Sequence, residues 1–144
     1  MIALDTNILV HAHRRDASLH DAARRKVKET AESLQPWAIG YHSLVEFYGI
    51  VTHPKIWNAP STPEQACLQI DAWRAAPALR ILHDSSDSLE HLMILSVRAK
   101  VHGPLIHDAR IAAYCLSHGV RELWTVDRDF SRFPSLKTRN PLAD

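Results

Sequence analysis

The sequence lacks several features that would mark whole classes of protein. It has two cysteines, Cys67 and Cys115, and no CxxC spacing. A disulfide scaffold or a cysteine zinc centre is therefore not expected, and both cysteines are predicted to be reduced core residues of a cytoplasmic protein. Uncharged apolar runs fall far short of the ~20 residues that a membrane span needs. The first residues show no basic segment followed by a cleavage-type sequence, so no targeting signal is expected.

A strong net charge and sequence repeats are also absent. Lys and Arg total 17 against 16 Asp and Glu, which gives a net charge of +1. A nucleic-acid partner would therefore have to be held by a local basic patch and not by bulk charge. Apolar residues make up 46% of the 144 residues and charged residues 23%, which is ordinary globular composition. The length predicts one domain over residues 1–144.

Short apolar runs alternate with helical patterns along the whole chain. Strands are predicted at 2–5, 37–41, 79–83 and 122–126, with a short final strand at 136–138. Helices are predicted at 7–14, 18–33, 43–51, 63–75, 89–101 and 108–119. Ser43 is expected to cap the third helix, and Thr62-Pro63-Glu64-Gln65 to start the fourth. Strands separated by helices predict an α/β fold with a mostly parallel sheet covered on both faces.

The first predicted strand ends on a carboxylate, in the sequence MIALDTNILV. Asp is rare in strands and is almost never buried without a partner. In parallel sheets, ligands bind beyond the carboxyl ends of the strands. Asp5 and Asp127 each follow an apolar strand, so both are expected on the same rim of the sheet.

Two further acids are predicted to reach this rim. Glu46 lies one turn into the helix that follows the second strand, and Asp108 at the start of the helix that precedes the last long strand. Two unit charges about 4 Å apart repel by ~4 kcal/mol at an effective dielectric constant of about 20. Four such carboxylates need a cation or protonation, and oxygen-only ligands suit Mg²⁺ or Mn²⁺. A cation of this kind can activate water and polarise a phosphodiester.

Each acid also has an ordinary structural explanation. Asp5 alone could cap the following helix, and Asp108 could be a first-turn acid favoured by the helix dipole. Glu46 alone could be a solvated helical residue, although apolar neighbours surround it in sequence. Asp127 and Asp129 could be turn residues. The placement of all of them at strand ends and helix starts favours a shared site.

Four segments of the sequence resemble the acidic motifs of PIN-domain ribonucleases, and most closely those of VapC toxins. They are MIALDTNILV, HSLVEF around Glu46, HDARIAAYC around Asp108 and LWTVDRDF around Asp127. The resemblance implies a three-layer α/β/α sandwich and Mg²⁺- or Mn²⁺-dependent endonuclease action on RNA. It also implies a homodimer and a cognate VapB-like antitoxin whose C-terminal segment lies over the active-site groove.

The same resemblance assigns roles to individual positions. The acidic metal-site positions match Asp5, Glu46, Asp108 and Asp127. The polar companions match Thr6, Asn7 and Thr125. Asp129 matches the second acid of the last motif, and whether it contacts metal directly is left open.

Basic and aromatic groups near the motifs are candidates for further contacts. Arg14, Arg110 and Arg128 lie close in sequence to the acidic motifs and are candidates for binding RNA phosphates. His42 and His107 flank the motifs and could reach a phosphate or leaving group, with surface packing as the alternative. The helices at 18–33 and around Ser43 are expected to form an apolar groove for an antitoxin helix.

Other functions remain open at this stage. A phosphoryl-accepting signalling domain would need a Lys where the chain has Asp127 and Arg128, and an aspartyl phosphatase would need an acid in place of Asn7. A non-catalytic nucleic-acid-binding domain would normally have lost one of the acids. A PIN nuclease of RNA processing, without an antitoxin, would keep them all.

Overall fold

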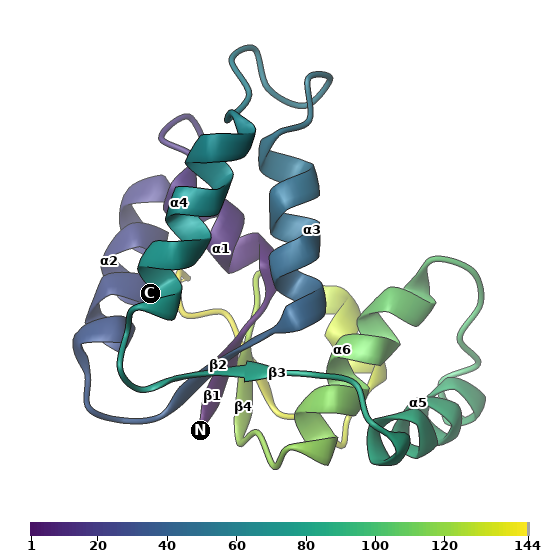
Figure 1. Ribbon diagram of the computed structural model, residues 1–144. Helices are drawn as coiled ribbons and strands as arrows, with labels where there is room; N and C mark the ends of the chain where they lie inside the picture. Colours follow the sequence, from purple (N-terminus) through teal and green to yellow (C-terminus); the bar gives the residue numbers. More distant parts are fainter. Residues whose placement is uncertain (144) are drawn as a thin grey trace.

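The centre of the molecule is a five-stranded sheet, seen in a computed structural model that describes residues 1–143 (Figure 1). The strands are β1 (Ile2–Leu4), β2 (Trp37–Gly40), β3 (Leu79–Leu82), β4 (Glu122–Trp124) and β5 (Thr138–Arg139). Their order across the sheet is β3-β2-β1-β4-β5, and every pair is parallel. The predicted parallel sheet is therefore confirmed.

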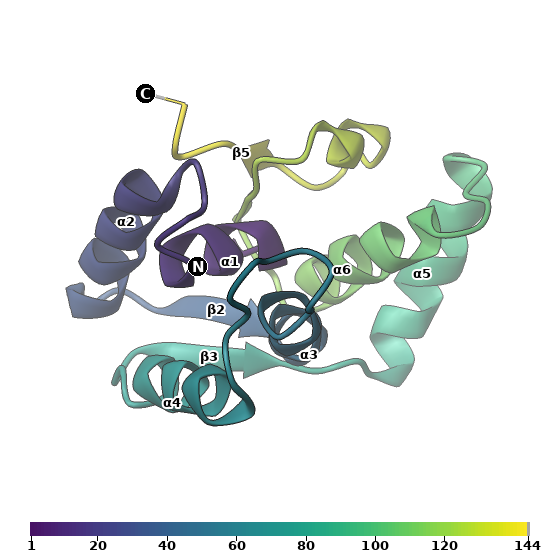
Figure 2. The same ribbon diagram turned by 90° about the horizontal axis from the view of Figure 1, so that it is seen from above.

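Helices cover both faces of this sheet. They are α1 (Thr6–His13), α2 (His20–Glu32), α3 (Tyr41–Val51), α4 (Pro63–Arg74), α5 (Ser86–Arg98) and α6 (Leu105–Ser117), with a 3₁₀ helix η1 (Arg128–Arg132). Helices α1 to α4 lie on one side, and α5 and α6 on the other (Figures 1 and 2). The predicted three-layer α/β/α sandwich is confirmed. No helix among residues 1–143 is long and apolar enough to cross a membrane.

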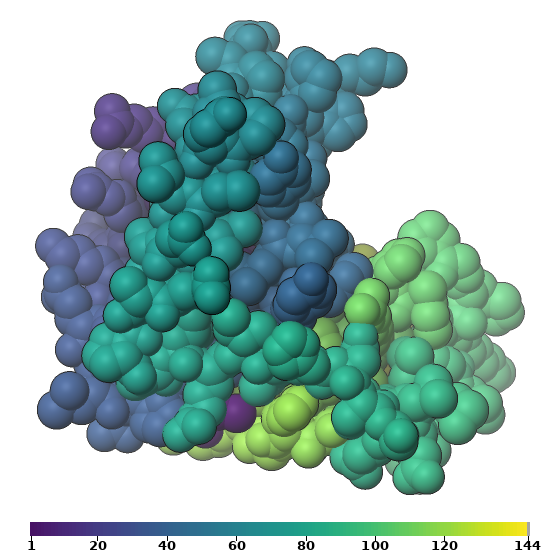
Figure 3. Space-filling model, in the orientation of Figure 1, coloured from purple at the N-terminus to yellow at the C-terminus, as the bar shows by residue number. Residues whose placement is uncertain are grey.

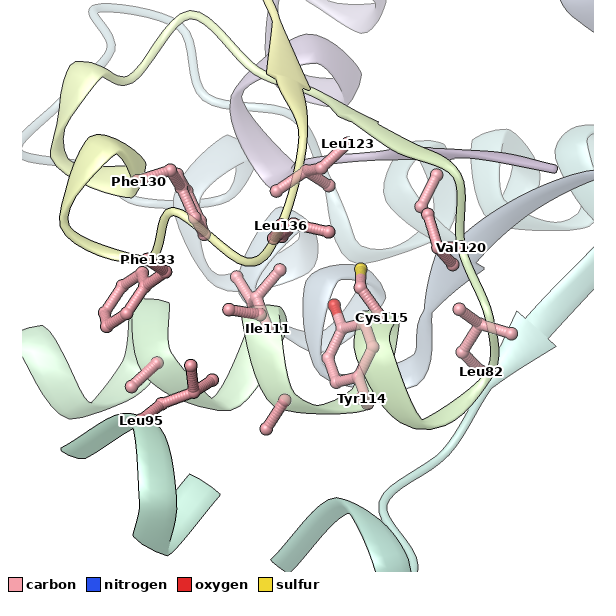
Figure 4. Packing of buried hydrophobic residues seen from close by; sticks show 14 of the residues in the cluster. Leu82, Leu95, Ile111, Tyr114, Cys115, Val120, Leu123, Phe130, Phe133 and Leu136 are labelled. Atoms are coloured by element: carbon pink, nitrogen blue, oxygen red, sulfur yellow. The ribbon is translucent and has the colours of Figure 1, made fainter. Parts of the chain in front are cut away.

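The core divides into two halves because successive strand residues point to opposite faces of a sheet. Ala3 and Leu123 face α6, where they pack with Ile111, Tyr114 and Phe130 (Figure 4). The next residues along the same strands, which are Leu4 and Trp124, face the opposite half under α1 to α4. Strands β1 and β4 are thus buried on both sides, which holds their carboxyl ends firmly at the rim.

The predicted N-terminal cap of α4 is confirmed, whereas that of α3 is wrong. At α4 the predicted cap is confirmed, because Thr62 accepts a hydrogen bond from the Gln65 backbone and the Gln65 side chain accepts one from the Thr62 backbone. At α3 the predicted Ser43 cap is wrong. The helix starts at Tyr41, directly after β2, with Gly40 as its cap. Ser43 is buried inside the helix instead and is hydrogen-bonded at 3.1 Å to the Tyr114 hydroxyl.

Several other boundaries differ from prediction. Helix α6 begins at Leu105, so Asp108 lies within its first turn and not at its first residue. Strand β4 ends at Trp124, three residues before Asp127. Strand β5 occupies Thr138–Arg139 and not residues 136–138. Short strands shift easily in this way because one backbone pairing adds or removes a residue.

Two predictions about surfaces are wrong. Cys67 is exposed on α4, and only Cys115 belongs to the core. The expected groove between α2 and α3 does not form, because α1 packs against both helices and lies between them (Figures 1 and 2). An apolar hollow of about 470 Å³ lies on the other side of α3, facing α4 and β3, with Leu44, Tyr48 and Ile70 in its lining.

Candidate active site

The candidate site lies where the parallel strands end. Asp5 directly follows β1, α3 directly follows β2, and Asp127 lies just beyond β4. Glu46 on α3 and Asp108 on α6 come from the two helices that flank a wide notch in the molecular surface (Figure 3). The prediction that the carboxyl ends of the strands gather the acids at one rim is correct in this respect.

Asp5 is the most deeply buried acid of the site, with only 5% of its surface exposed. Its Oδ1 accepts a hydrogen bond from the Thr6 backbone at 2.7 Å, so it caps α1. Its Oδ2 accepts hydrogen bonds from the Thr125 hydroxyl at 2.7 Å and the Asn7 side chain at 3.2 Å. Burial nevertheless raises the pKa of Asp5 to about 6, with a smaller contribution from Glu46 and Asp108. Asp5 is therefore both a helix cap and a member of the site.

Asn7 and Thr125 join the start of α1 to the loop after β4. The Asn7 amide donates to Thr125 Oγ1 at 3.1 Å, and Asn7 Oδ1 accepts from the Val126 backbone at 3.3 Å. Thr125 Oγ1 also accepts from the Asp127 backbone at 3.0 Å. These bonds fix the position of Asp127 relative to Asp5. Asn7 and Thr125, to which the resemblance assigns supporting roles, thus lie in hydrogen-bond contact with the segments that carry Asp5 and Asp127.

Glu46 faces the first turn of α1. Its Oε1 accepts a hydrogen bond from the Thr6 hydroxyl at 2.7 Å. The same oxygen lies 3.8 Å from Nε2 of His42, one turn earlier on α3. Glu46 also raises the pKa of both Asp5 and Asp108, which places it within electrostatic reach of the two other acids.

Asp108, Asp127 and Asp129 form the tightest cluster of carboxylates among residues 1–143. One oxygen from each lies within 4.8 Å of the others. Burial raises the pKa of Asp108 to about 6, and the charges of Asp127, Asp129 and Glu46 add to the effect. Asp127 Oδ1 also accepts a hydrogen bond from the Asp129 backbone at 2.8 Å, which begins η1.

The sequence left open whether Asp129 contacts a metal, and the structure places Asp129 among the clustered carboxylates. Asp5 and Glu46 lie beside the cluster, and both interact by charge with Asp108. Asp129 stands in the three-acid cluster because η1 turns the chain sharply after Asp127, so that a side chain two residues further on returns to the same place. A strand-end rule cannot predict such a turn.

The three predicted RNA-binding arginines have different surroundings. Arg14 follows the C-terminus of α1, a helix of eight residues or about 12 Å, while Asp5 caps its N-terminus. Its guanidinium binds Asp16 and lies 4.4 Å from the centre of the Trp57 ring. Arg14 is therefore not brought to the acids. Arg128 is exposed beside Asp127, where it is open to a phosphate.

Arg110 has partners that sequence reasoning missed. Its guanidinium binds both carboxylate oxygens of Asp84, and Nη1 lies 3.1 Å from Nδ1 of His42. The His42 ring stacks on His107 with ring centres 5.9 Å apart. Burial lowers the pKa of His42. Asp84 follows β3 as Asp5 follows β1, so the same strand-end signal could have identified it.

The donor set fits a small divalent cation. All the gathered side chains offer carboxylate oxygens, which Mg²⁺ and Mn²⁺ prefer. Two of the carboxyl groups have pKa values raised to about 6, because burial and neighbouring negative charge penalise their ionised forms. A cation would remove that penalty. Asp108, Asp127 and Asp129 would hold it, with Asp5 and Glu46 beside them.

Comparison with known proteins identifies the family to which this fold belongs. The PIN domain family model matches residues 2–136. Ribonuclease VapC43 of Mycobacterium tuberculosis is 32% identical over 142 residues, which cover 99% of this chain and 96% of the relative. Ribonuclease VapC48 of the same species is 30% identical over 145 residues, with 96% of each chain covered.

Solved structures show the same fold at lower identity. FitAcB from Neisseria gonorrhoeae gives a TM-score of 0.72 at 18% identity and covers 100% of both chains. VapC20 of Mycobacterium tuberculosis, described as a sarcin-ricin loop cleaving toxin, gives 0.68 at 21% identity and covers 91% of this chain and 93% of its own. The family match disfavours the signalling-domain and phosphatase alternatives. The chain belongs to the PIN-domain family, among the VapC proteins.

Proposed function

We propose that this protein is a Mg²⁺- or Mn²⁺-dependent endoribonuclease that hydrolyses RNA phosphodiester bonds, and that it acts in the cytoplasm as the toxin of a type II toxin–antitoxin pair. The observation that carries the catalytic part is the cluster of Asp108, Asp127 and Asp129 within 4.8 Å, beside the buried Asp5. The choice of RNA as substrate is supported by relatives that are named ribonucleases and match nearly the whole chain.

Each acid has a distinct place in this proposal. Asp108, Asp127 and Asp129 bind the cation. The buried carboxylate of Asp5, which the Thr125 hydroxyl orients, adds a negative charge beside them. When bound, the cation supplies charge stabilisation of the phosphate and lowers the pKa of a water molecule. With a pKa of about 6, Asp5 is ionised at neutral pH and is ready to serve as a ligand.

Glu46 is suited to accept a proton. Its Oε1 is held by the Thr6 hydroxyl at 2.7 Å, so the carboxylate is fixed in orientation. In the proposed reaction its Oε2 faces the cation site, where its charge adds to the affinity for the cation and it accepts the proton of the attacking water. The P–O bond to the leaving oxygen breaks in line, and that oxygen takes up a proton from solvent. Arg128 and Arg110 lie next to the acidic motifs in sequence, and we propose that Arg128, which is exposed, binds the RNA backbone.

The proposed partner is a cognate VapB-like antitoxin protein, and the proposed assembly includes a homodimer of this chain. Support comes from structural neighbours that are toxin–antitoxin complexes, including one from Klebsiella pneumoniae with a TM-score of 0.62. The VapBC2 complex of Rickettsia felis, bound to a promoter DNA fragment, gives 0.71 at 23% identity. Co-expression with a VapB-like antitoxin, followed by size-exclusion chromatography with light scattering, tests both assemblies.

The catalytic proposal is tested with labelled RNA and Mg²⁺. We expect endonucleolytic fragments from the wild type and none after EDTA, with activity restored by added Mn²⁺. Asp108→Asn should lower the cleavage rate by at least about 100-fold, because removing one carboxylate weakens both cation binding and charge stabilisation. Asp71→Asn is the matched control, since Asp71 is an exposed acid on α4 paired with Arg74. Unimpaired cleavage by folded Asp108→Asn would refute the proposal.

A further inference from the structure

A series of polar contacts leads into the site from the edge of the sheet. Asp84 lies just after β3 and binds the Arg110 guanidinium through both carboxylate oxygens. Arg110 on α6 contacts Nδ1 of His42 at 3.1 Å, and Nε2 of His42 lies 3.8 Å from Oε1 of Glu46 on the same helix. The series therefore joins β3, α6 and α3, and it ends on an acid of the candidate site.

The contact with Arg110 fixes which nitrogen of His42 carries the hydrogen. A guanidinium can only donate hydrogen bonds, so Nδ1 of His42 must accept. In the neutral ring the hydrogen is then on Nε2, which faces Glu46. Asp84 holds the guanidinium in a two-pronged pairing, and this keeps Arg110 pointed at the ring.

The Nε2 atom of His42 is buried and has no hydrogen-bond partner among the described residues. Buried donors in folded proteins are nearly always paired, so an unpaired one calls for an explanation. Glu46 Oε1 is 3.8 Å away, beyond hydrogen-bond distance but close enough that a small movement of the carboxylate would complete the bond. The same oxygen already accepts from Thr6, so both contacts act on one side of the carboxylate.

We propose that His42 is a positioning residue for Glu46: held by Arg110 and Asp84, it presents its Nε2 hydrogen to Oε1 of Glu46 and, with Thr6, turns the other carboxylate oxygen toward the cation site. This inference rests on the proposed function, in which the acids beside Glu46 hold a divalent cation. Groups that orient a metal-site carboxylate typically change metal affinity by about 10- to 100-fold when they are removed.

The test uses two variants that each keep one half of the ring's hydrogen-bonding pattern. The amide of Gln reaches about as far as Nε2, so His42→Gln keeps a donor for Glu46. Asn reaches about as far as Nδ1, so His42→Asn keeps only the group facing Arg110. Binding of Mn²⁺ alone is measured from the electron paramagnetic resonance signal of free Mn²⁺, without RNA.

We expect His42→Asn to weaken Mn²⁺ binding by about tenfold or more, and His42→Gln to stay within about threefold of the wild type. Arg110→Met should weaken Mn²⁺ binding as well. Without the guanidinium, the hydrogen of the neutral His42 ring can move from Nε2 to Nδ1, and Glu46 then loses its donor. His91→Asn is the matched control, since His91 also lies one turn from an acid, with Nε2 3.6 Å from Asp87 on α5. Equal Mn²⁺ affinity in His42→Asn and His42→Gln would overturn the proposal.

A second measurement separates positioning from a general effect on folding. In a Glu46→Gln background, His42→Asn should cause no further loss of Mn²⁺ affinity, because the group that it orients is already changed. An equal loss in both backgrounds would contradict the proposal. If Asp108→Asn leaves Mn²⁺ binding intact, the proposed cation site itself is wrong. If Asp108→Asn abolishes binding and His42→Asn has no effect, only the role of His42 is wrong.

Discussion

The hydroxyl of Thr125 donates a hydrogen bond of 2.7 Å to Oδ2 of Asp5, a residue 120 positions away in the sequence. The two residues follow neighbouring parallel strands, β4 and β1, which brings their side chains to the same rim. The same hydroxyl accepts from the backbone of Asp127 at 3.0 Å. One small side chain therefore stabilises the negative charge of the buried acid and fixes the start of the segment that carries Asp127.

Replacing Thr125 tests this dual role. Thr125→Val removes a hydrogen bond to a buried charged group and should lower the free energy of unfolding by about 1–3 kcal/mol at pH 8. Since the bond lowers the pKa of Asp5, its loss should raise that pKa above about 6. The penalty should therefore shrink at pH 5, where Asp5 is protonated. Urea unfolding at pH 5 and pH 8 measures this loss of unfolding free energy. Thr125→Ser, which keeps the hydroxyl, is the control.

Asp108 should destabilise the metal-free protein at neutral pH. Its pKa rises from 3.8 to about 6 on folding, so the folded state binds its proton more tightly than the unfolded state. The stabilising contribution of the protonated group is complete below pH about 3.8 and is lost as the pH rises through about 6. Asp108→Asn should then raise the free energy of unfolding at pH 8 by about 1–2 kcal/mol, after allowance for its partial exposure.

Unfolding of wild type and Asp108→Asn in EDTA across pH 4.5 to 8 measures this difference. Groups that do not interact with Asp108 contribute equally to both proteins, so the comparison isolates the carboxylate together with its charge interactions with His107 and the neighbouring acids. The gain should be greatest at pH 8 and clearly smaller at pH 4.5, and it vanishes only below pH about 3.8. A variant that is less stable than the wild type at pH 8 would contradict the electrostatic account of the site.

Gly40 should tolerate no side chain. A Cβ atom there would overlap the hydroxyl and ring atoms of Tyr114, which is buried and hydrogen-bonded to Ser43. Gly40→Ala should lower the free energy of unfolding by about 3 kcal/mol, at the upper end of the cost of overpacking. It should also reduce activity, because Gly40 caps the helix that carries Glu46.

Gly49, on the same helix, provides the matched control for this substitution. A Cβ atom there meets nothing within 4 Å. Gly49→Ala should stabilise the protein by about 0.5–1 kcal/mol, because Ala loses less backbone freedom than Gly in a helix. Thermal unfolding of the two variants should therefore shift in opposite directions, and a shared direction would show that the Tyr114 contact is unimportant.

The two cysteines should differ sharply in reactivity. Cys67 is exposed on α4, whereas Cys115 is buried and its pKa is raised far above the ordinary value by burial. A disulfide reagent should label one thiol rapidly in the folded protein and two after denaturation. Cys67→Ser should abolish the rapid reaction. Rapid labelling of that variant would mean that the core around Cys115 opens.

The sequence by itself determined the architecture and most of the acids. Alternating strand and helix patterns can satisfy their backbone hydrogen bonds and bury both sheet faces in few ways other than a parallel sheet between helical layers. In such a sheet the carboxyl ends of the strands share one rim, so Asp5, Glu46, Asp108 and Asp127 could be placed there from their positions alone. Thr62 and Gln65 likewise start a helix through contacts within four residues.

Only the tertiary structure decided how the groups at the rim face one another. The turn of η1 brings Asp129 into the carboxylate cluster, and the close approach of α6 to β2 buries Ser43 against Tyr114. The length of α1 keeps Arg14 away from the acids. Because α1 lies between α2 and α3, the apolar hollow is found instead between α3, α4 and β3.

These outcomes depend on the rotation and spacing of packed elements. The contacts among Asp84, Arg110 and His42 join three elements, and each requires a particular rotation of α3 and α6 about their axes. Hydrophobic spacing sets which face of a helix is buried but not its rotation to within the few ångströms that a hydrogen bond needs. Packing of whole side chains against the sheet supplies that precision, and it arises from distant parts of the chain at once.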